Sequence, residues 1–541
     1  MIVEFEQATA ASAAAPGRAF TRLAVGQVWR GMLIVASAIA GMSALVASQY
    51  QTTFAGAVDA AALRALAENP AIRILFGMPL ALDDPGGFTV WRTGTPVQVL
   101  AAVWALLTAT RITRGEEDAG RWDLLLGGRL RTVDLVLRCW ITLAVAAVVN
   151  GIAVAAALVA SGTDIVGAVV HAVGVLGTML MFAGAGLFAA QLLPSRAAAA
   201  GLTGGFLGVC LLLRMLADGV PQLAWVAWCT PFGLTARAAP YADNRGWPLA
   251  VLVALAVLLA GAACTAARHR DLGGAPLAMP TSRPPRTRLL GSVAGFCLRR
   301  ALRPTVGWAV GIAAYYFLVG ALLASILQFL DENPRFAELA ATAGFGGLDT
   351  ATGFAAALFS LLAIPTGLYA ATRLTVMASD ERARRWTAIY ALPLSRARLA
   401  GTDIAVTAWG VVLLLLTAAV AMWAGAAITR APLTLTAALA GALNAAPVAW
   451  LALGAAAFAL GWFPSTVAAL GALPVVGGFL LDVIVSSIQA PAWLTIFSPF
   501  AHLAAVPDTP PNWTASSVLT LIAAALTTVG LLGYSRRDLN T

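Results

Sequence analysis

The chain contains many long runs of residues that are almost free of charged side chains. Examples are residues 31–48, 249–267, 404–427 and 516–534. A helix needs about 20 apolar residues to cross the hydrocarbon core of a bilayer, which is about 30 Å thick. Charged residues make up 11% of the chain, whereas a soluble domain carries about 25%. The sequence therefore predicts an all-α integral membrane protein, because membrane β-strands would show alternation instead of continuous apolar runs.

We expect twelve transmembrane helices in two tandem six-helix halves. The first half (31–267) has predicted spans near 29–48, 89–110, 136–160, 167–190, 198–216 and 248–267. The second half (304–534) has predicted spans near 306–325, 353–372, 404–427, 435–460, 466–487 and 514–534. Three further segments complete the organisation, namely an N-terminal segment (1–30), a linker (268–303) and a tail (535–541).

The basic residues are all arginines, and their positions predict the orientation of the chain. Of the 34 arginines, 26 fall on the side of the predicted membrane that also holds both termini. Short loops rich in arginine stay in the cytoplasm. We therefore expect a multi-pass protein of a bacterial plasma membrane with both termini cytoplasmic.

The absence of lysine has a functional consequence. A Walker A motif needs a lysine that reaches the phosphates of ATP, and the sequence contains none. The chain therefore lacks a standard nucleotide-binding domain of its own. We expect no enzymatic site, no cofactor and no metal in this chain, and no nucleic-acid partner. The five scattered cysteines are expected to be small packing residues.

The two halves repeat short motifs in the same order, which indicates gene duplication. The repeated pairs are Glu68-Asn69-Pro70 with Glu332-Asn333-Pro334, Arg121-Trp122 with Arg385-Trp386, Pro194-Ser195 with Pro464-Ser465, and Arg270-Asp271-Leu272 with Arg537-Asp538-Leu539. Because each half has an even number of predicted spans, both halves should have the same orientation and be related by an axis along the membrane normal.

A charged segment follows the second predicted span of each half. It contains Glu116, Glu117, Arg121 and Trp122 in the first half, and its second-half counterparts are Asp380, Glu381, Arg385 and Trp386. Glu117 and Arg121 are four residues apart, as are Glu381 and Arg385, so each pair is expected to form an ion pair on one helix face. A solvated helix at the membrane surface is the simpler interpretation. Its recurrence at the same place in both halves favours a docking element.

These motifs, together with Pro393-Leu394-Ser395-Arg396 and the terminal Arg-Asp-Leu of each half, resemble the ABC-2 permease family of ABC transporters. The fused arrangement resembles the exporters of polyketide antibiotics and other drugs in that family. The first half departs from this pattern, because it has Gly128-Arg129-Leu130-Arg131-Thr132 where the second has its proline and serine.

The resemblance implies the following roles. Segments 115–134 and 379–398 would be coupling helices that seat two copies of a separate ATPase subunit, which would bind ATP and Mg²⁺. Segments 18–30 and 287–303 would be interfacial elbow helices. The loops 217–247 and 488–513 would form short re-entrant helices at the outer mouth, although their tryptophans fit an ordinary aromatic belt equally well. The transported molecule would be a hydrophobic or amphiphilic drug, an antibiotic or a lipid-like compound.

Charged residues inside a span are costly, and each therefore needs an explanation. Asp482 is the one carboxylate that the predicted spans place at depth, and Arg214 is its counterpart in the first half. We expect the two to pair at an extracellular gate, unless each extends to its own interface. His171, Asn150 and Asn444 are expected to form polar contacts between helices. The residues that bind the transported molecule are not apparent from the sequence.

A proton-coupled twelve-span secondary transporter is the alternative function. It would also have two six-span halves, and segment 115–121 faintly resembles a loop motif of the major facilitator class. Proton coupling, however, requires a titratable carboxylate at depth, and Asp482 is the single residue near that requirement. We therefore favour the membrane subunit of an ATP-driven exporter.

Overall fold

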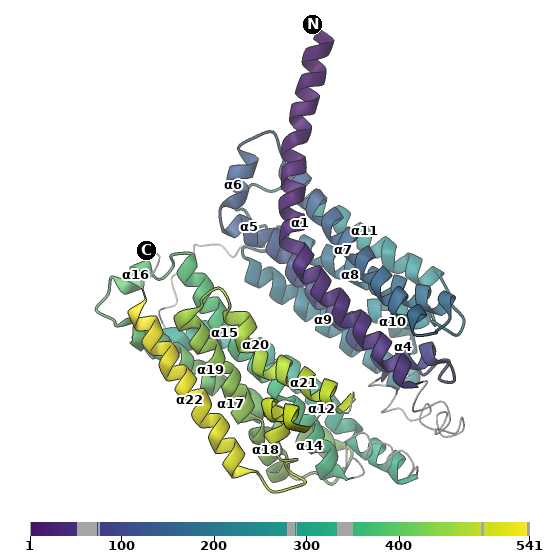
Figure 1. The fold of residues 1–541 in the computed structure, drawn as a ribbon, viewed down its shortest axis with the longest axis vertical. Coiled ribbons are helices and arrows are strands. Elements are labelled where there is room, and N and C mark those ends of the chain that lie inside the picture. The colour runs from purple at the N-terminus through teal and green to yellow at the C-terminus, as the bar shows by residue number, and fades with distance from the viewer. Residues whose placement is uncertain are drawn as a thin grey trace. The chain divides into compact units, whose positions relative to one another are not determined.

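The computed structural model describes residues 2–50, 73, 76–277, 287, 289–332, 350–487 and 492–537. Within this part of the chain the regular structure is helical and there is no strand. The chain divides into two compact units, Met1–Arg283 and Pro284–Thr541. Each unit is described by itself below (Figure 1). The repeated Glu-Asn-Pro motifs, three of the linker prolines and the last four residues lie wholly or partly outside the described residues.

The first unit is a bundle of six long helices with short helices between them (Figure 1). The long helices are α1 (Ile2–Gln49), α4 (Pro85–Ile112), α7 (Thr132–Ala160), α8 (Ile165–Leu192), α9 (Arg196–Gly219) and α11 (Trp247–Arg268). The short ones are α5 (Arg114–Asp118), α6 (Arg121–Leu126), η2 (Pro221–Cys229) and α10 (Pro231–Arg237).

The second unit begins with the 40-residue helix α12 (Val293–Glu332). The other long helices or helix pairs are α14 (Ala351–Leu361) with α15 (Ala363–Arg382), α17 (Arg396–Ile428), α18 (Leu435–Asn444) with α19 (Ala446–Trp462), and α22 (Trp513–Arg536). The remaining elements are α16 (Thr387–Tyr390), α20 (Val467–Ala472), η3 (Leu473–Gly477), α21 (Gly478–Ser487), η4 (Ala492–Phe497) and η5 (Pro499–His502).

Eleven helices of the described residues are long and apolar enough to cross a membrane. The protein is therefore a multi-pass, all-α membrane protein, as predicted. The predicted eleventh span, residues 466–487, is broken into α20, the π-helical turn η3 and α21. Pro474 lies in that turn and has no backbone N–H, so the regular ladder of helical hydrogen bonds is interrupted there. The predicted count of twelve thus rests on this interrupted segment.

Local sequence signals explain where the helices begin. Asp84 accepts hydrogen bonds from the backbone N–H groups of Gly86 and Gly87, and Pro85 occupies the first helical position of α4. Ser195 and Ser395 cap α9 and α17 in the same way. Such caps satisfy backbone donors that have no partner within the helix.

The predicted elbow segments are continuous with long helices, and their position at the membrane surface stays a prediction. Residues 18–30 are part of the uninterrupted helix α1, and residues 293–303 are part of α12. No proline follows Pro16 within α1, so nothing in the sequence forces a bend between the interfacial segment and the span. The loops that we expected to hold short re-entrant helices do hold short helices, η2 with α10 and η4 with η5. Their re-entrant position in the membrane stays a prediction.

The internal packing of the two units follows the same order. In the first unit α1 packs against α7, α4 against α8, and α8 against α11. In the second unit α12 packs against α17, α15 against α19, and α19 against α22. Counted along each unit, these are the first helix with the third, the second with the fourth, and the fourth with the sixth. The repeated packing agrees with the duplication that the sequence motifs indicate.

Glycines permit the closest helix contacts. A Cβ atom added at Gly320 of α12 would overlap the carbonyl oxygen of Met422 in α17, and one added at Gly425 would overlap the carbonyl oxygen of Phe317. Gly461 of α19 and Gly530 of α22 approach each other in the same manner. Small residues of this kind are what allow helix backbones to approach in a membrane protein.

Candidate functional site

The charged segment of the first unit bends twice before α7 begins. Thr113 ends α4, and α5 follows directly. Gly120 then turns the chain in the left-handed region, at φ +70°, and α6 begins at Arg121. Glycine adopts this conformation without steric cost, whereas other residues do so rarely. Segment 115–134 is therefore two short helices and a loop, not one continuous helix.

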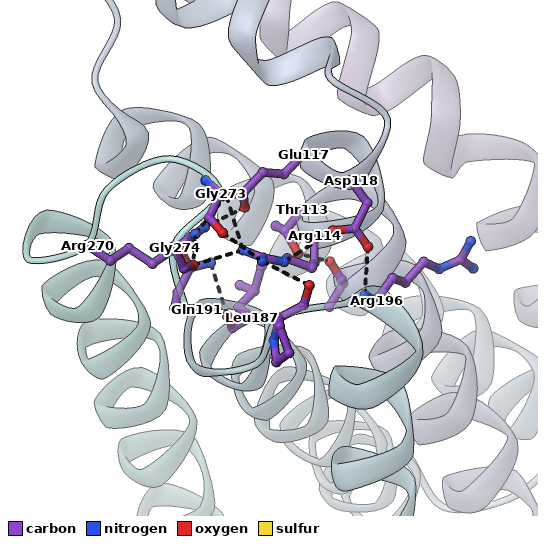
Figure 2. A network of polar contacts seen from close by, with 12 residues as sticks. Thr113, Arg114, Glu117, Asp118, Leu187, Gln191, Arg196, Arg270, Gly273 and Gly274 are labelled. Atoms are coloured by element: carbon purple, nitrogen blue, oxygen red, sulfur yellow. Dashed lines mark hydrogen bonds and ion pairs between the residues drawn. The ribbon is translucent and has the colours of Figure 1, made fainter. Parts of the chain in front are cut away.

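Glu117 is the centre of a buried network in this unit. Its carboxylate accepts hydrogen bonds from both terminal nitrogens of Arg270, one of them at 2.7 Å, and from the backbone N–H of Gly273 at 2.8 Å. The side chains of Glu117 and Arg270 are 4% and 3% exposed. Arg114 adds a second ion pair to Glu117 at 3.1 Å. Figure 2 shows these groups converging from the segment after α4 and from the end of α11.

Further contacts connect this network to two more helices. Arg270 donates to the side-chain oxygen of Gln191 near the end of α8, at 2.9 Å. Arg114 donates to the carbonyl oxygen of Pro194, and Asp118 accepts from the backbone N–H of Arg196 at the start of α9 (Figure 2). The segment after α4 is thus bound to the C-terminal ends of α8 and α11 and to the N-terminal end of α9.

The second unit repeats the central ion pair. Arg537, just after α22, donates to both oxygens of Glu381. The side chain of Glu381 is 11% exposed and that of Arg537 is 20% exposed. The pair is therefore less buried than its counterpart. A hydrogen bond of 2.6 Å between the hydroxyls of Tyr390 and Tyr534 joins the same two segments.

A second ion pair is also repeated, and it faces outward. Arg121 binds Glu116 through two nitrogens, and Arg385 binds Asp380 at 2.9 Å. The two arginine side chains are 56% and 64% exposed. The tryptophans that follow them, Trp122 and Trp386, are buried. Each segment therefore presents an arginine to its surroundings and anchors itself with a tryptophan.

The predicted pairing within these segments was wrong. We expected Glu117 with Arg121 and Glu381 with Arg385, at a spacing of four. Instead Arg121 binds Glu116 and Arg385 binds Asp380, each five positions earlier. Each glutamate binds an arginine about 150 residues later. The helix ends between the two groups in both units, so the spacing rule for a continuous helix does not apply.

The second unit has an additional buried cluster for which the first has no counterpart among the described residues. Arg300 of α12 binds Asp380 at 2.6 Å, approaches Asp403 of α17 at 3.7 Å and stacks 4.5 Å above the ring of Trp386. Arg373 binds Asp403 at 3.1 Å. Arg373 also donates to the carbonyl oxygen of Arg300 in α12 at 3.5 Å, and in the first unit Arg111 likewise donates to the carbonyl oxygen of Gln27 in α1.

Arg214 has a partner that we did not expect. Its Nε lies 2.6 Å from a carboxylate oxygen of Asp218, one turn further along α9, and it also donates to Thr95 and to the carbonyl oxygen of Phe76. Asp482 lies partly exposed in α21 of the other unit. The proposed gate pair of Arg214 with Asp482 stays a prediction. To form it, Arg214 would have to leave Asp218 or bind both carboxylates.

Two carboxylates that we expected to lie in loops lie within helices instead. Asp218 and Asp403 are buried within helices α9 and α17. Both lie at the ends of predicted spans, and boundaries that are wrong by a few residues moved them into loops. The role of Arg270 and Arg537 was likewise missed, although the repeated Arg-Asp-Leu tripeptides signalled them.

Comparisons with known proteins agree with the earlier resemblance. Residues 290–535 match the family described as the C-terminal domain of the multidrug efflux system permease Rv1217c. The whole permease protein Rv1217c of Mycobacterium tuberculosis is 27% identical to this chain over 488 residues, which cover 88% of this chain and 87% of the relative. The resemblance to a fused efflux permease of the ABC-2 kind is confirmed.

Proposed function

We propose that this protein is the membrane subunit of an ATP-driven multidrug exporter and that two copies of a separate ATPase dock on its two charged segments. The observation that carries this proposal is the duplicated ion pair, Glu117 with Arg270 and Glu381 with Arg537. In each unit it ties the segment after the second helix to the end of the sixth. A force applied to the segment would therefore reach the bundle through a fixed connection.

The chemistry of the segments fits a protein partner. Arg121 and Arg385 are exposed and their carboxylate partners are largely buried, so the arginines are the groups available for contact. Arginine is well suited to such interfaces because its planar group donates several hydrogen bonds. Both units keep this arrangement, which favours two equivalent docking positions on the side that we expect to be cytoplasmic.

Transport would follow from alternation between two states of the bundle. ATP-driven closure of the two ATPases would shift the equilibrium between inward-open and outward-open states, provided the ATPases bind one state more tightly. The transported compounds would be hydrophobic or amphiphilic, such as polyketide-like drugs or lipidic molecules. The name of the relative and the apolar helices of this chain support that class.

The proposal is tested by co-purification. The chain is co-expressed with ABC ATPase subunits from the same genome, and the purified complex is assayed for ATP hydrolysis with and without drug. We expect a stable complex with two ATPase subunits and hydrolysis that rises with drug. Transport that continues without any ATPase, and stops when the proton gradient is abolished, would instead establish the proton-coupled alternative, for which Asp218 and Asp403 supply buried carboxylates.

A further inference from the structure

A pocket lies within the first unit between α4, α8, α9 and α10, far from the charged network. Its volume is about 60 Å³. Its walls include Trp91, Phe232, Gln98, His171 and Arg214. His171 and Gln191 are both on α8 and twenty residues apart, which at 1.5 Å per residue separates the pocket from the network by about 30 Å.

Two polar side chains of this pocket have unused hydrogen-bonding capacity. His171 is 3% exposed, and neither of its ring nitrogens has a hydrogen-bond partner among the described residues. Gln98 accepts a hydrogen bond from Thr235 at 2.9 Å through its side-chain oxygen, and its amide nitrogen has no acceptor among the described residues. Buried polar groups nearly always have a partner. A group bound in the pocket can therefore complete the hydrogen bonding of these two side chains.

The charge of the pocket argues for a neutral occupant. Arg214 is the cation in its wall, and Asp218 neutralises it at 2.6 Å, while its other nitrogens already donate to Thr95 and Phe76. A charged ligand would lose its hydration without gaining a free counter-charge. The wall is about half polar and half apolar, which suits a molecule that has both a polar group and an apolar body.

An apolar groove borders the pocket. A second groove runs between α8 and α11 and is lined by valine, leucine, alanine and glycine alone. Val170 lines both the groove and the pocket, and Val169 next to it is 47% exposed. The groove and the pocket therefore share a wall residue next to His171 in the sequence.

We propose that this pocket binds a small neutral amphiphile, whose hydroxyl or carbonyl group is held by His171 and Gln98 and whose apolar body lies against Trp91 and Phe232. Imidazole and amide groups together supply both a donor and an acceptor for such a group. The inference deepens the proposed function by naming a substrate class. It concerns one unit alone and needs no ATPase.

Photolabelling of the purified full-length chain in lipid nanodiscs tests this site. The probes are octan-1-ol carrying a diazirine and octane carrying the same diazirine, and labelled peptides are mapped by mass spectrometry. We expect the alcohol to label peptides 86–98 and 165–178 at low concentration and to be displaced by unlabelled octan-1-ol. A hydrogen bond in such a site contributes about 0.5 to 1.5 kcal/mol, and the middle of this range corresponds to about a fivefold change in affinity. His171→Leu should therefore weaken labelling by the alcohol about fivefold and leave labelling by the alkane unchanged.

Matched variants separate binding from folding. His171→Asn keeps a donor and an acceptor and should retain most of the labelling by the alcohol. A Cβ at Gly94 would lie 3.5 Å from the His171 ring, an ordinary contact, so Gly94→Ala should be neutral, whereas Gly94→Leu should fill the pocket and abolish labelling by both probes. Labelling that survives Gly94→Leu, or that His171→Leu lowers equally for both probes, overturns the proposal.

The result is independent of the proposed function. If the chain binds the alcohol at this pocket but no ATPase complex forms, the proposed binding site is supported and the proposed exporter function is contradicted. If the complex forms and hydrolyses ATP but the pocket is not labelled, the proposed exporter function is supported and its substrates bind at another site. Labelling is compared only between variants that have the same thermal unfolding midpoint. If His171→Leu does not fold, the comparison of Gly94→Leu with Gly94→Ala tests the proposal.

Discussion

Glu117 and Arg270, which are 153 residues apart, form a two-bond ion pair that is almost completely buried. The counterpart in the second unit, Glu381 with Arg537, spans 156 residues and is more exposed. Duplication has thus preserved a long-range contact, although the two copies differ in their environment. This difference makes the contribution of burial measurable within one molecule.

The first prediction compares the two copies. Removing one partner of a buried ion pair costs about 3 to 5 kcal/mol, because the other charge remains buried. We expect Glu117→Ala to lower the free energy of unfolding by about that amount and Glu381→Ala by about 1 to 2 kcal/mol, because its arginine can reach water. Denaturant unfolding in detergent measures both. Asp243→Ala removes an exposed ion pair with Arg245 and serves as the control, with an expected effect below about 1 kcal/mol.

The second prediction concerns the two exposed arginines. Arg385→Ala should change stability by less than about 1 kcal/mol, because Asp380 keeps its ion pair with Arg300. Arg121→Ala should cost about 1 to 3 kcal/mol, because the buried carboxylate of Glu116 loses its partner. Drug-stimulated ATP hydrolysis of the complex should nevertheless fall, and the double variant should fall furthest. Arg303→Ala, an exposed arginine of α12, is the matched control. Unchanged hydrolysis in the double variant would exclude these arginines from the docking interface.

The third prediction uses the repeated turn within the charged segments. Gly120 and Arg384 occupy equivalent positions and both have positive φ, +70° and +55°. The left-handed conformation costs a residue with a side chain about 1 to 2 kcal/mol. Gly120→Arg should therefore destabilise the first unit, whereas Arg384→Gly should leave the second unchanged or stabilise it. Equal losses from both substitutions would show that the two turns are not equivalent.

The fourth prediction tests the close contact between α12 and α17. Gly320→Ala should destabilise the protein by about 1 to 3 kcal/mol, because the added methyl group would overlap the carbonyl oxygen of Met422 and force the helices apart. Gly311 lies on the same helix with nothing within 4 Å of an added Cβ. Gly311→Ala should therefore be neutral or stabilising. Thermal unfolding midpoints of the two variants provide the comparison.

The fifth prediction concerns orientation. Of the five cysteines, only Cys229 is exposed, and it lies in the loop that we expect outside the cell. A membrane-impermeant maleimide should label it in intact cells and should not label a Cys229→Ser variant. In that variant background, Ser379→Cys, an exposed position next to Asp380, should react only after permeabilisation. The reverse pattern would place the charged segments outside.

The sequence was informative about the fold because hydropathy acts locally. Runs such as 136–160 and 404–427 lie within single helices, α7 and α17, since about 20 apolar residues in lipid have no alternative to helical hydrogen bonding. The segment 466–487 was less predictable. Its hydropathy fits a span, but Pro474 breaks the backbone pattern, and the six-residue helix α20 results.

The candidate site was predictable in its residues and not in its contacts. Glu117, Glu381, Arg121 and Arg385 were identified by their repetition, and the structure brings all of them into ion pairs. Their partners were assigned wrongly because a spacing rule assumes a continuous helix. Asp403 and Asp218 were missed because a loop and a buried helix end look alike in a hydropathy profile.

The sequence by itself determined that this protein is a helical membrane protein, that its charged segments recur and that one ancestral unit was duplicated. These properties depend on composition and order along the chain. Only the tertiary structure decided that Glu117 binds Arg270, that Arg214 binds Asp218 and that His171 faces a pocket. Such contacts arise between residues far apart in sequence or across a helix end, where packing of the bundle selects the partner and no local periodicity records it.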